Sequence, residues 1–213
     1  MAYTVQEVIA RVADHANDTN MSAMTTDELF KPIDAANKSS YRACASAGVA
    51  VAEKFSDLTV GIGIALLDGA STPTLPTDLV RPIRLWEKAS IGAVYLTKMQ
   101  PVTDLPDEVT QAKLRYWVWR NGKIYFVGST VSNVVRVIYH YKVTDLTDVL
   151  NNIWNDDLLD VIAMAAAAHY VRKKGGEAFA TSLEARAAAE LTNFIKAEAM
   201  AKIPIGGRAG ANG

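Results

Sequence analysis

The sequence lacks several features that would narrow its function. It has one cysteine in 213 residues, which excludes an intrachain disulfide and a zinc site built from several cysteines. Its net charge is only −1, so no strong overall field attracts nucleic acid or a membrane surface. No apolar run approaches the roughly 20 residues that span a bilayer, and residues 1–18 show no secretion signal. We therefore expect a globular protein made in the cytoplasm.

Motifs for catalysis and nucleotide binding are missing as well. The sequence has no phosphate-binding loop with its lysine, no nucleophile elbow and no paired-histidine zinc helix. Gly61 and Gly63 match part of a dinucleotide-binding fingerprint, but Leu66 stands where that fingerprint needs a third glycine. Glycines within a strand are the favoured interpretation. We expect no enzyme activity and no cofactor.

Isolated reactive side chains have simpler interpretations. Cys44 lies among alanines and is expected to be a small buried hydrophobic residue. Three aspartates suit the positive end of a helix dipole better than a metal or an acid–base pair; they are Asp156, Asp157 and Asp160. Three histidines are far apart in sequence and would hold a metal only if they converged in space; they are His15, His140 and His169. We favour surface or cap roles for them and expect no metal.

Hydrophobic periodicity predicts helices at both ends of the chain. A first helix is expected over about residues 3–16. Thr25 and Glu28 have the spacing of a capping box and precede a second helix that is expected to reach about residue 55. Pro32 lies inside this segment, so either the helix begins there after a short turn or it kinks there.

Two alanine-rich helices are expected near the C-terminus. The first begins at the aspartates and ends at the basic run 172–174, followed by Gly175 as a left-handed cap. The second runs over about residues 177–201, and the two are expected to form an antiparallel hairpin. Beyond them, residues 204–213 have too little apolar surface to order themselves.

The middle of the chain is rich in strand patterns. Strands are expected near residues 58–67, 79–87, 113–120, 123–128 and 134–143. Asn121-Gly122 predicts a two-residue hairpin turn of type I′, because both residues accept a positive φ. Pro82 favours an edge position for its strand. The last strand alternates between an apolar face and a mainly polar face.

Four aromatic residues lie on the predicted hairpin, namely Tyr116, Trp117, Trp119 and Tyr125. They could stack on the bases of a single-stranded nucleic acid. Few basic residues neighbour them, so packing in a core or an interface is the favoured interpretation.

These elements predict an α+β fold. A helical bundle from the N- and C-terminal helices carries a β-rich insertion, which forms a sheet or a small barrel. We expect N-terminal helices over 1–57, a β-rich subdomain over 58–150, a C-terminal helical hairpin over 151–203, and a flexible tail over 204–213.

The order of the segments is the most informative feature. The motifs that carry it are Asn17-Asp18, Thr25-Thr26-Asp27-Glu28-Leu29, Asp34-Ala35-Ala36-Asn37, Leu75-Pro76-Thr77-Asp78, Val137-Ile138-Tyr139-His140-Tyr141, Asp145-Leu146-Thr147 and Asp157-Leu158-Leu159-Asp160. In this order, over nearly the whole chain, they resemble the head-to-tail adaptor (connector) proteins of tailed bacteriophages.

The resemblance implies a structural protein of the virion neck. Such adaptors form a ring, usually of twelve copies, between the portal and the tail or nozzle proteins. Packaged DNA passes through the lumen without sequence-specific contact, no membrane is involved, and the chain is made in the host cytoplasm. The resemblance also implies portal binding by the C-terminal tail, at Ile205, Gly206, Gly207, Arg208, Ala209 and Gly210.

Other functions remain open from the sequence. Another neck or tail component, such as a head-closure protein or a tail terminator, belongs to the same class. A nucleic-acid-binding protein is disfavoured by the near-neutral charge. A small enzyme is disfavoured by the absent motifs.

Overall fold

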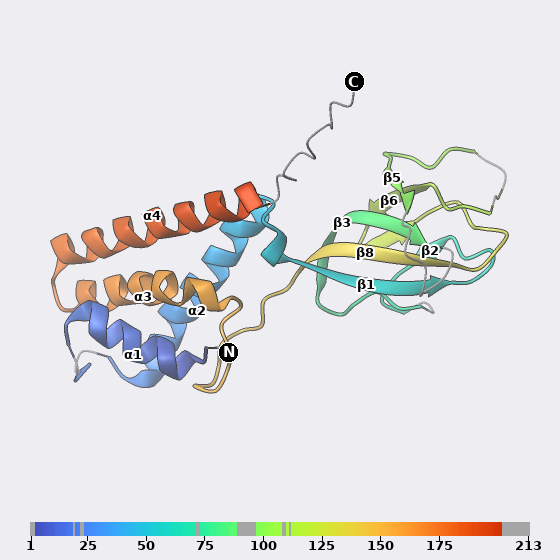
Figure 1. The fold of residues 1–213 in the computed structure, drawn as a ribbon. Helices are drawn as coiled ribbons and strands as arrows, with labels where there is room; N and C mark the ends of the chain where they lie inside the picture. The colour runs from blue at the N-terminus through green and yellow to red at the C-terminus, as the bar shows by residue number, and fades with distance from the viewer. Residues whose placement is uncertain are drawn as a thin grey trace, which may run out of the picture. The chain divides into compact units, whose positions relative to one another are not determined.

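The chain folds into two compact units. A computed structural model describes residues 3–18, 20–21, 24–70, 73–88, 97–107, 110 and 112–201. Residues 1–52 and 143–213 form a helical unit, and residues 53–142 form a β unit (Figure 1). The β unit is therefore an insertion between terminal helices. The predicted α+β class is confirmed, with 43% of the described residues in helices and 24% in strands.

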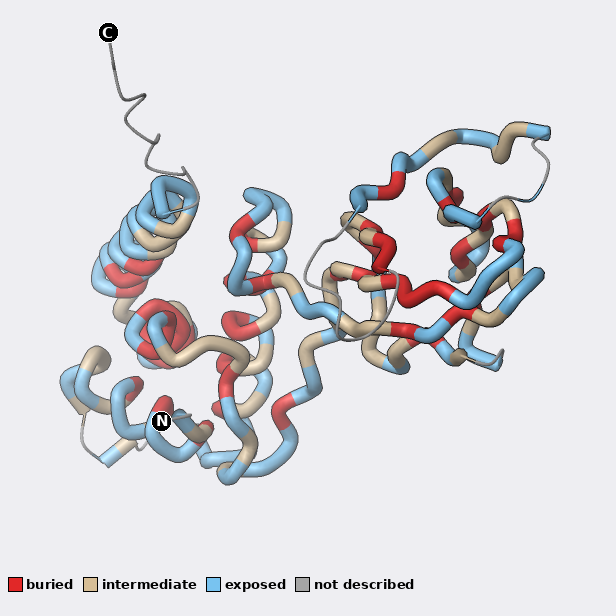
Figure 2. The backbone as a smooth tube through the Cα atoms, turned by 45° about the vertical axis from the view of Figure 1, so that its right-hand side comes forward, coloured by how far each residue is buried: buried red, intermediate tan, exposed pale blue. Residues whose placement is uncertain are grey.

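In the described part of the helical unit, the long helices are α1 (Val5–Ala16), α2 (Thr26–Ser46), α3 (Leu159–Lys173) and α4 (Glu177–Ala201). Helix α3 packs against each of the other three. Its alanines allow this, because Ala163, Ala166 and Ala167 are fully buried and keep the helix narrow. Figure 2 shows the buried residues along α3. The predicted packing of N- and C-terminal helices into one bundle is confirmed.

The N-terminal ends of α1 and α2 are closed by capping boxes. The Thr25 hydroxyl accepts from the Glu28 amide, and the Glu28 carboxylate accepts from the Thr25 amide at 2.8 Å. This confirms the predicted start of α2. Thr4 and Glu7 make the same arrangement at α1, which the sequence analysis missed. Each box satisfies amides that the first helical turn leaves without partners.

Helix α2 decides between the two alternatives at Pro32 and ends earlier than predicted. It begins before Pro32 and contains it, so the interpretation that the helix starts at Pro32 is wrong. It ends at Ser46 rather than near residue 55. Gly48 takes a left-handed φ of 68°, and the Val49 amide donates to the Cys44 carbonyl at 3.0 Å, which closes the helix. A short 3-10 turn, Ala50–Ala52, then leads into the first strand.

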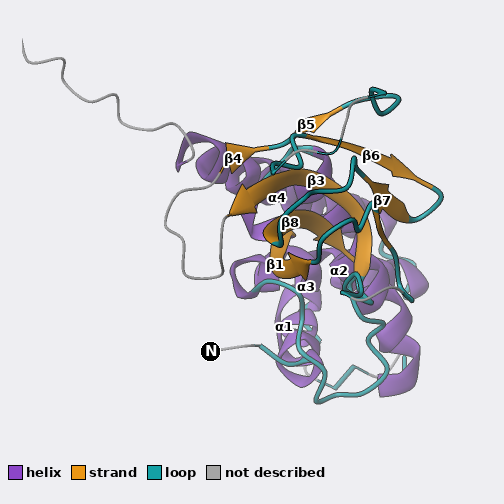
Figure 3. Ribbon diagram, turned by 90° about the vertical axis from the view of Figure 1, so that its right-hand side faces the viewer, coloured by secondary structure: helices purple, strands orange, loops and turns teal. Residues whose placement is uncertain are grey.

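Two sheets form the β unit (Figure 3). The larger has the order β1 (Glu53–Val60), β8 (Asn133–Tyr141), β3 (Leu79–Lys88) and β4 (Thr97–Lys98). The smaller has the order β2 (Leu66–Leu67), β7 (Lys123–Tyr125), β6 (Tyr116–Arg120) and β5 (Gln100–Pro101). Side chains of both sheets share one apolar core, which includes Leu85, Val137, Trp117 and Ile124.

The predicted hairpin turn is confirmed. Asn121 has φ 53° and Gly122 has φ 72°, and the flanking residues of β6 and β7 pair in antiparallel register. The prediction that Pro82 lies in an edge strand is wrong, because β3 lies between β8 and β4 in the sheet. Among the described residues, β4 pairs with β3 only at Trp86 and Glu87, and Pro82 lies between two irregularities of the β3–β8 register, where a proline disturbs the ladder least.

Other predicted strand bounds are wrong. The strand expected over 58–67 is β1, which begins at Glu53 and ends at Val60, and a turn separates it from β2. In this turn Gly63 has φ 73° and donates to the Ser129 carbonyl at 2.8 Å. The strands expected over 113–120 and 123–128 are shorter, at 116–120 and 123–125, whereas the strand expected near 134–143 lies at 133–141, close to its prediction.

Candidate interaction surfaces

Cys44 belongs to the core, as the sequence predicted. Its side chain is fully buried in α2. Burial raises the pKa of the thiol to about 11, and the Glu198 carboxylate contributes in the same direction. The thiol is therefore protonated at neutral pH, which does not suit a nucleophile.

The histidines and aspartates have structural surroundings. His15 Nε2 lies 3.4 Å from an Asp160 carboxylate oxygen, and His169 is exposed on α3. His140 lies in the β unit, where burial lowers its pKa. The Asp156 carboxylate accepts from the Tyr3 amide at 2.9 Å. Over the described residues, no group of three or more His, Cys, Asp or Glu side chains is placed to hold a metal ion.

The hairpin aromatics divide between core and surface. Trp117 is buried in the core of the β unit, and Trp119 packs against that core. The favoured interpretation of these two residues as packing groups is confirmed. Tyr116 and Tyr125 are half-buried. With both tryptophans facing the core, this hairpin cannot present the series of rings that stacking on successive bases requires.

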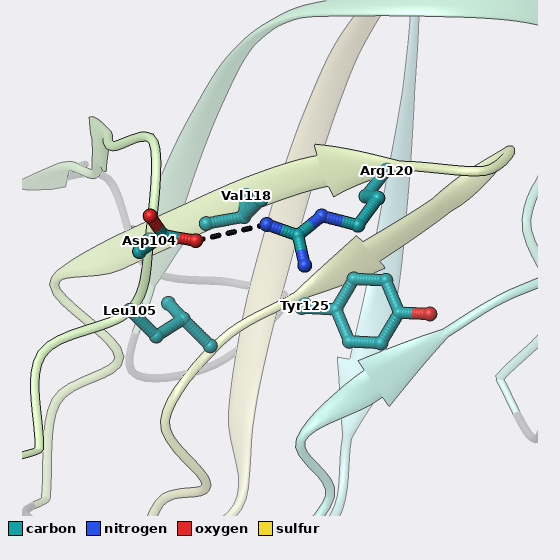
Figure 4. Close-up of a pocket in the computed structure, with 5 residues that line it drawn as sticks. All are labelled: Asp104, Leu105, Val118, Arg120 and Tyr125. Atoms are coloured by element: carbon teal, nitrogen blue, oxygen red, sulfur yellow. Dashed lines mark hydrogen bonds and ion pairs between the residues drawn. The ribbon is translucent and has the colours of Figure 1, made fainter.

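A pocket lies on the outer face of the hairpin, and the sequence analysis did not anticipate it. Its lining is Asp104, Leu105, Val118, Arg120 and Tyr125, and its volume is about 300 Å³. Val118 and Tyr125 are cross-strand partners and form an apolar floor with Leu105. Arg120 Nη2 donates to Asp104 Oδ1 at 2.8 Å beside this floor (Figure 4). This hairpin pocket suits an apolar group rather than a reaction, because its polar groups already form an ion pair.

A second surface is the outward side of the larger sheet. We define the outer sheet face by three cross-strand rows, Glu53–His140–Arg81, Phe55–Ile138–Arg84 and Asp57–Arg136–Trp86. Phe55 is its most exposed apolar residue, at 64%. The sequence predicted a mainly polar side for the last strand but gave no indication of the partners from β1 and β3 that complete this face.

Ion pairs hold the outer sheet face in place. Asp57 accepts two hydrogen bonds from Arg136, at 2.8 and 2.9 Å, and one from Lys88 at 2.9 Å. Chiefly because of Arg136, and then Lys88, the pKa of Asp57 falls to about 2. The Arg136 guanidinium lies 4.5 Å from the centre of the Phe55 ring. Glu53 accepts a further hydrogen bond from Arg84.

A third surface is a small turn in the helical unit, residues 147–151, which we call the Leu150 turn. The Asn151 side chain accepts from the amides of Thr147 and Asp148, at 2.8 and 2.9 Å. The Asp148 carboxylate accepts from the Leu150 amide at 2.9 Å. Leu150 is nevertheless 72% exposed, the largest value among the exposed large hydrophobic residues that the structure describes.

The residues assigned to portal binding, Ile205, Gly206, Gly207, Arg208, Ala209 and Gly210, lie outside the described residues. In the part of the chain that is described, no helix has the length and the apolar character needed to cross a bilayer.

A protein-family model matches nearly the whole chain. The model of the SU10 adaptor protein family matches residues 3–212. This chain belongs to that family. The resemblance to phage head-to-tail adaptors is thereby confirmed, and the match spans both the helical unit and the β unit. A comparison with curated proteins found no match.

Membership settles the general class of the protein. It is a structural adaptor of a bacteriophage, which associates with other capsid or tail proteins in the virion neck. Families of this kind are normally not enzymes. Surfaces that bind proteins are therefore the relevant sites, and the hairpin pocket, the outer sheet face and the Leu150 turn are the candidates.

Proposed function

We propose that this adaptor forms a ring that joins the portal to the tail components and encloses part of the DNA passage. The family match over residues 3–212 carries the proposal, because it covers nearly the whole chain rather than one motif. The physical properties of the chain support it. With a net charge of −1, the chain has no overall field that would hold DNA tightly during passage.

A ring of identical copies needs two different surfaces on each copy, because each copy meets one neighbour on either side. The chain offers surfaces of different chemistry on its two units. One is the outer sheet face of the β unit, and the other is the Leu150 turn of the helical unit. We propose twelve copies, by analogy with the usual number in head-to-tail adaptors.

We further propose that the C-terminal residues 205–210 become ordered on a portal subunit. Their composition supports this, since a glycine-rich segment of low apolar content gains order by docking rather than by folding alone. Such docking would place one connection to the portal at every subunit of the ring.

The mass of the assembly tests the ring. The purified chain is mixed with portal protein, and the mass of the complex is measured by analytical ultracentrifugation. A complex with about one adaptor per portal subunit is expected. A stoichiometry of one or two adaptors per whole portal would contradict the ring.

Truncation after Ile203 tests the tail. The truncated chain should bind portal at least about tenfold more weakly, because a docked segment contributes on the order of 1.4 kcal/mol or more. The control keeps residues 204–213 in scrambled order, which preserves length and composition. Equal portal affinity of the truncated and intact chains would refute the role of the tail, and would leave the ring itself standing.

A further inference from the structure

We propose that neighbouring copies of this chain join head to tail by docking the Leu150 turn of one copy on the outer sheet face of the next copy. The proposal rests on the ring function proposed above and assigns its contacts. It commits to a second copy of this chain as the occupant of the outer sheet face.

The Leu150 turn has the properties of a preformed binding element. Three side-chain hydrogen bonds fix it internally, from Asn151 and Asp148. Two backbone hydrogen bonds fix it to the start of α1, from the Gln6 amide to the Val149 carbonyl at 3.0 Å and from the Val5 amide to the Asn151 carbonyl at 2.8 Å. A turn that is already ordered loses little conformational entropy on binding. Leu150 is thus held in place while most of its surface faces water.

The outer sheet face offers a matching apolar centre. Phe55 is 64% exposed, and its cross-strand neighbour Ile138 is half-buried beside it. The Arg136 guanidinium contacts the Phe55 ring and is itself held by the Asp57 carboxylate. The motion of both the ring and the guanidinium is therefore restricted. Phenylalanine and arginine are enriched at protein interfaces, and arginine is among the residues that contribute most to binding energy there.

The charges of the two surfaces are complementary. The outer sheet face carries four cations, which are Arg81, Arg84, Arg136 and, behind Asp57, Lys88. The carboxylates of Glu53 and Asp57 balance two of them, so the formal surplus is two positive charges. By contrast, residues 143–158 contain four aspartates and no lysine or arginine. One of them, Asp145, is bonded to Lys38. Asp148 lies within the Leu150 turn, where its exposed carboxylate accepts from the Leu150 amide, so the turn itself carries negative charge. Opposite potentials favour encounter and correct orientation.

The two surfaces differ, so each copy contributes a turn to one neighbour and a sheet face to the other. Such a heterologous contact closes into a ring when its rotation divides a full circle, and otherwise continues as an open chain. A contact of a surface with itself would stop at two copies. The proposed contact therefore has the symmetry that the ring function requires.

Self-association of the full-length chain tests the contact. Sedimentation velocity is measured over a range of concentrations for the native chain and for Leu150→Ser and Phe55→Ser. Each substitution should weaken self-association about tenfold or more, as expected for removal of a central apolar anchor. Met200→Ser is the matched control, because Met200 is 67% exposed on α4 and takes no part in the proposed contact. Circular dichroism checks that each variant is folded.

A charge exchange tests the specific pairing. Asp148→Lys and Arg81→Glu should each weaken self-association, and a mixture of the two single variants should regain it in part. In this mixture the native turn of one variant meets the native sheet face of the other, and the two reversed surfaces meet each other, so the charges are complementary at both contacts. A similar loss in both single variants without recovery in the mixture would overturn the pairing.

Oxidative cross-linking tests the geometry. With Leu150→Cys and Phe55→Cys in one chain, head-to-tail contacts should produce a ladder of cross-linked trimers and larger species. The native Cys44 is fully buried and does not compete for cross-linking. A product that stops at dimers would overturn the inference. So would a native chain that stays monomeric at the highest concentration, or self-association that survives Leu150→Ser and Phe55→Ser. In the last case, and if the complex with portal still has ring stoichiometry, the ring function stands and only the assigned contact fails.

Discussion

Removal of the Asp57 carboxylate should destabilise the β unit. Its carboxylate receives Arg136 and Lys88, and the Lys88 side chain is only 6% exposed. Asp57→Asn leaves that ammonium without its carboxylate in a largely dehydrated place. Breaking a buried ion pair by removing one partner costs about 3–5 kcal/mol. Asp57 itself is 20% exposed, so we expect a loss of about 2–3 kcal/mol in the free energy of unfolding.

The matched control is Asp104→Asn, the same substitution in the same unit. The Asp104–Arg120 pair is 78% and 60% exposed, and exposed pairs contribute about 0–1 kcal/mol. Both variants are unfolded in urea and followed by tryptophan fluorescence. Three of the four tryptophans lie in the β unit, so the signal reports mainly on that unit.

A loss for Asp57→Asn no larger than that for Asp104→Asn would refute this reasoning. It would mean that the carboxylate gains as little from its two cations as an exposed pair does. A second variant separates charge from packing. Lys88→Met in the Asp57→Asn background removes the unpaired ammonium and should recover part of the lost free energy.

Two further predictions concern the helical unit. Thr25→Ala removes the capping hydroxyl of α2 and should lower the free energy of unfolding by about 1 kcal/mol, measured as a lower thermal midpoint; Thr26→Ala, one residue along, is the control and should have a smaller effect. Acid should weaken this unit as well. Lys174 and then Tyr170 lower the pKa of Asp18 to about 2, and the Thr25 amide and then Lys173 lower that of Glu28 to about 2, from ordinary values of 3.8 and 4.5. Because both folded pKa values are depressed, the stabilisation is complete above about pH 4.5 and is lost as the pH falls towards 2. Circular dichroism of thermal unfolding between pH 6 and pH 2 measures it, and an unchanged midpoint over that range would contradict the role of these carboxylates.

Local signals in the sequence predicted the elements that depend on local chemistry. Asn121-Gly122 determines its turn by backbone preference alone, and Thr25 with Glu28 determines a helix start within four residues. The predicted end of α2 was wrong because it depends on contacts that are distant in sequence. Apolar residues continue past Gly48 and maintain the helical pattern, while the left-handed glycine and the pairing of Glu53 with His140 decide the strand.

The candidate surfaces were less accessible to sequence analysis. The outer sheet face combines residues from three strands that are up to 87 positions apart, from Glu53 to His140, and register alone brings them together. The exposure of Leu150 depends on hydrogen bonds between the turn and the start of α1. In the sequence this leucine follows an apolar valine and has no feature that separates it from a core residue. The acidic residues Asp156 and Asp157 follow it in the sequence, but they indicated the start of a helix rather than an exposed leucine.

The chain departs for the β unit at Glu53 and comes back after Lys142, and Glu53 pairs directly with His140. Outgoing and returning strands are thus neighbours, separated by one ladder spacing of about 5 Å. An inserted module whose two junctions are adjacent can be exchanged for another of similar footprint without stretching the scaffold that carries it. This arrangement allows the β unit to be replaced while the helical bundle keeps its structure.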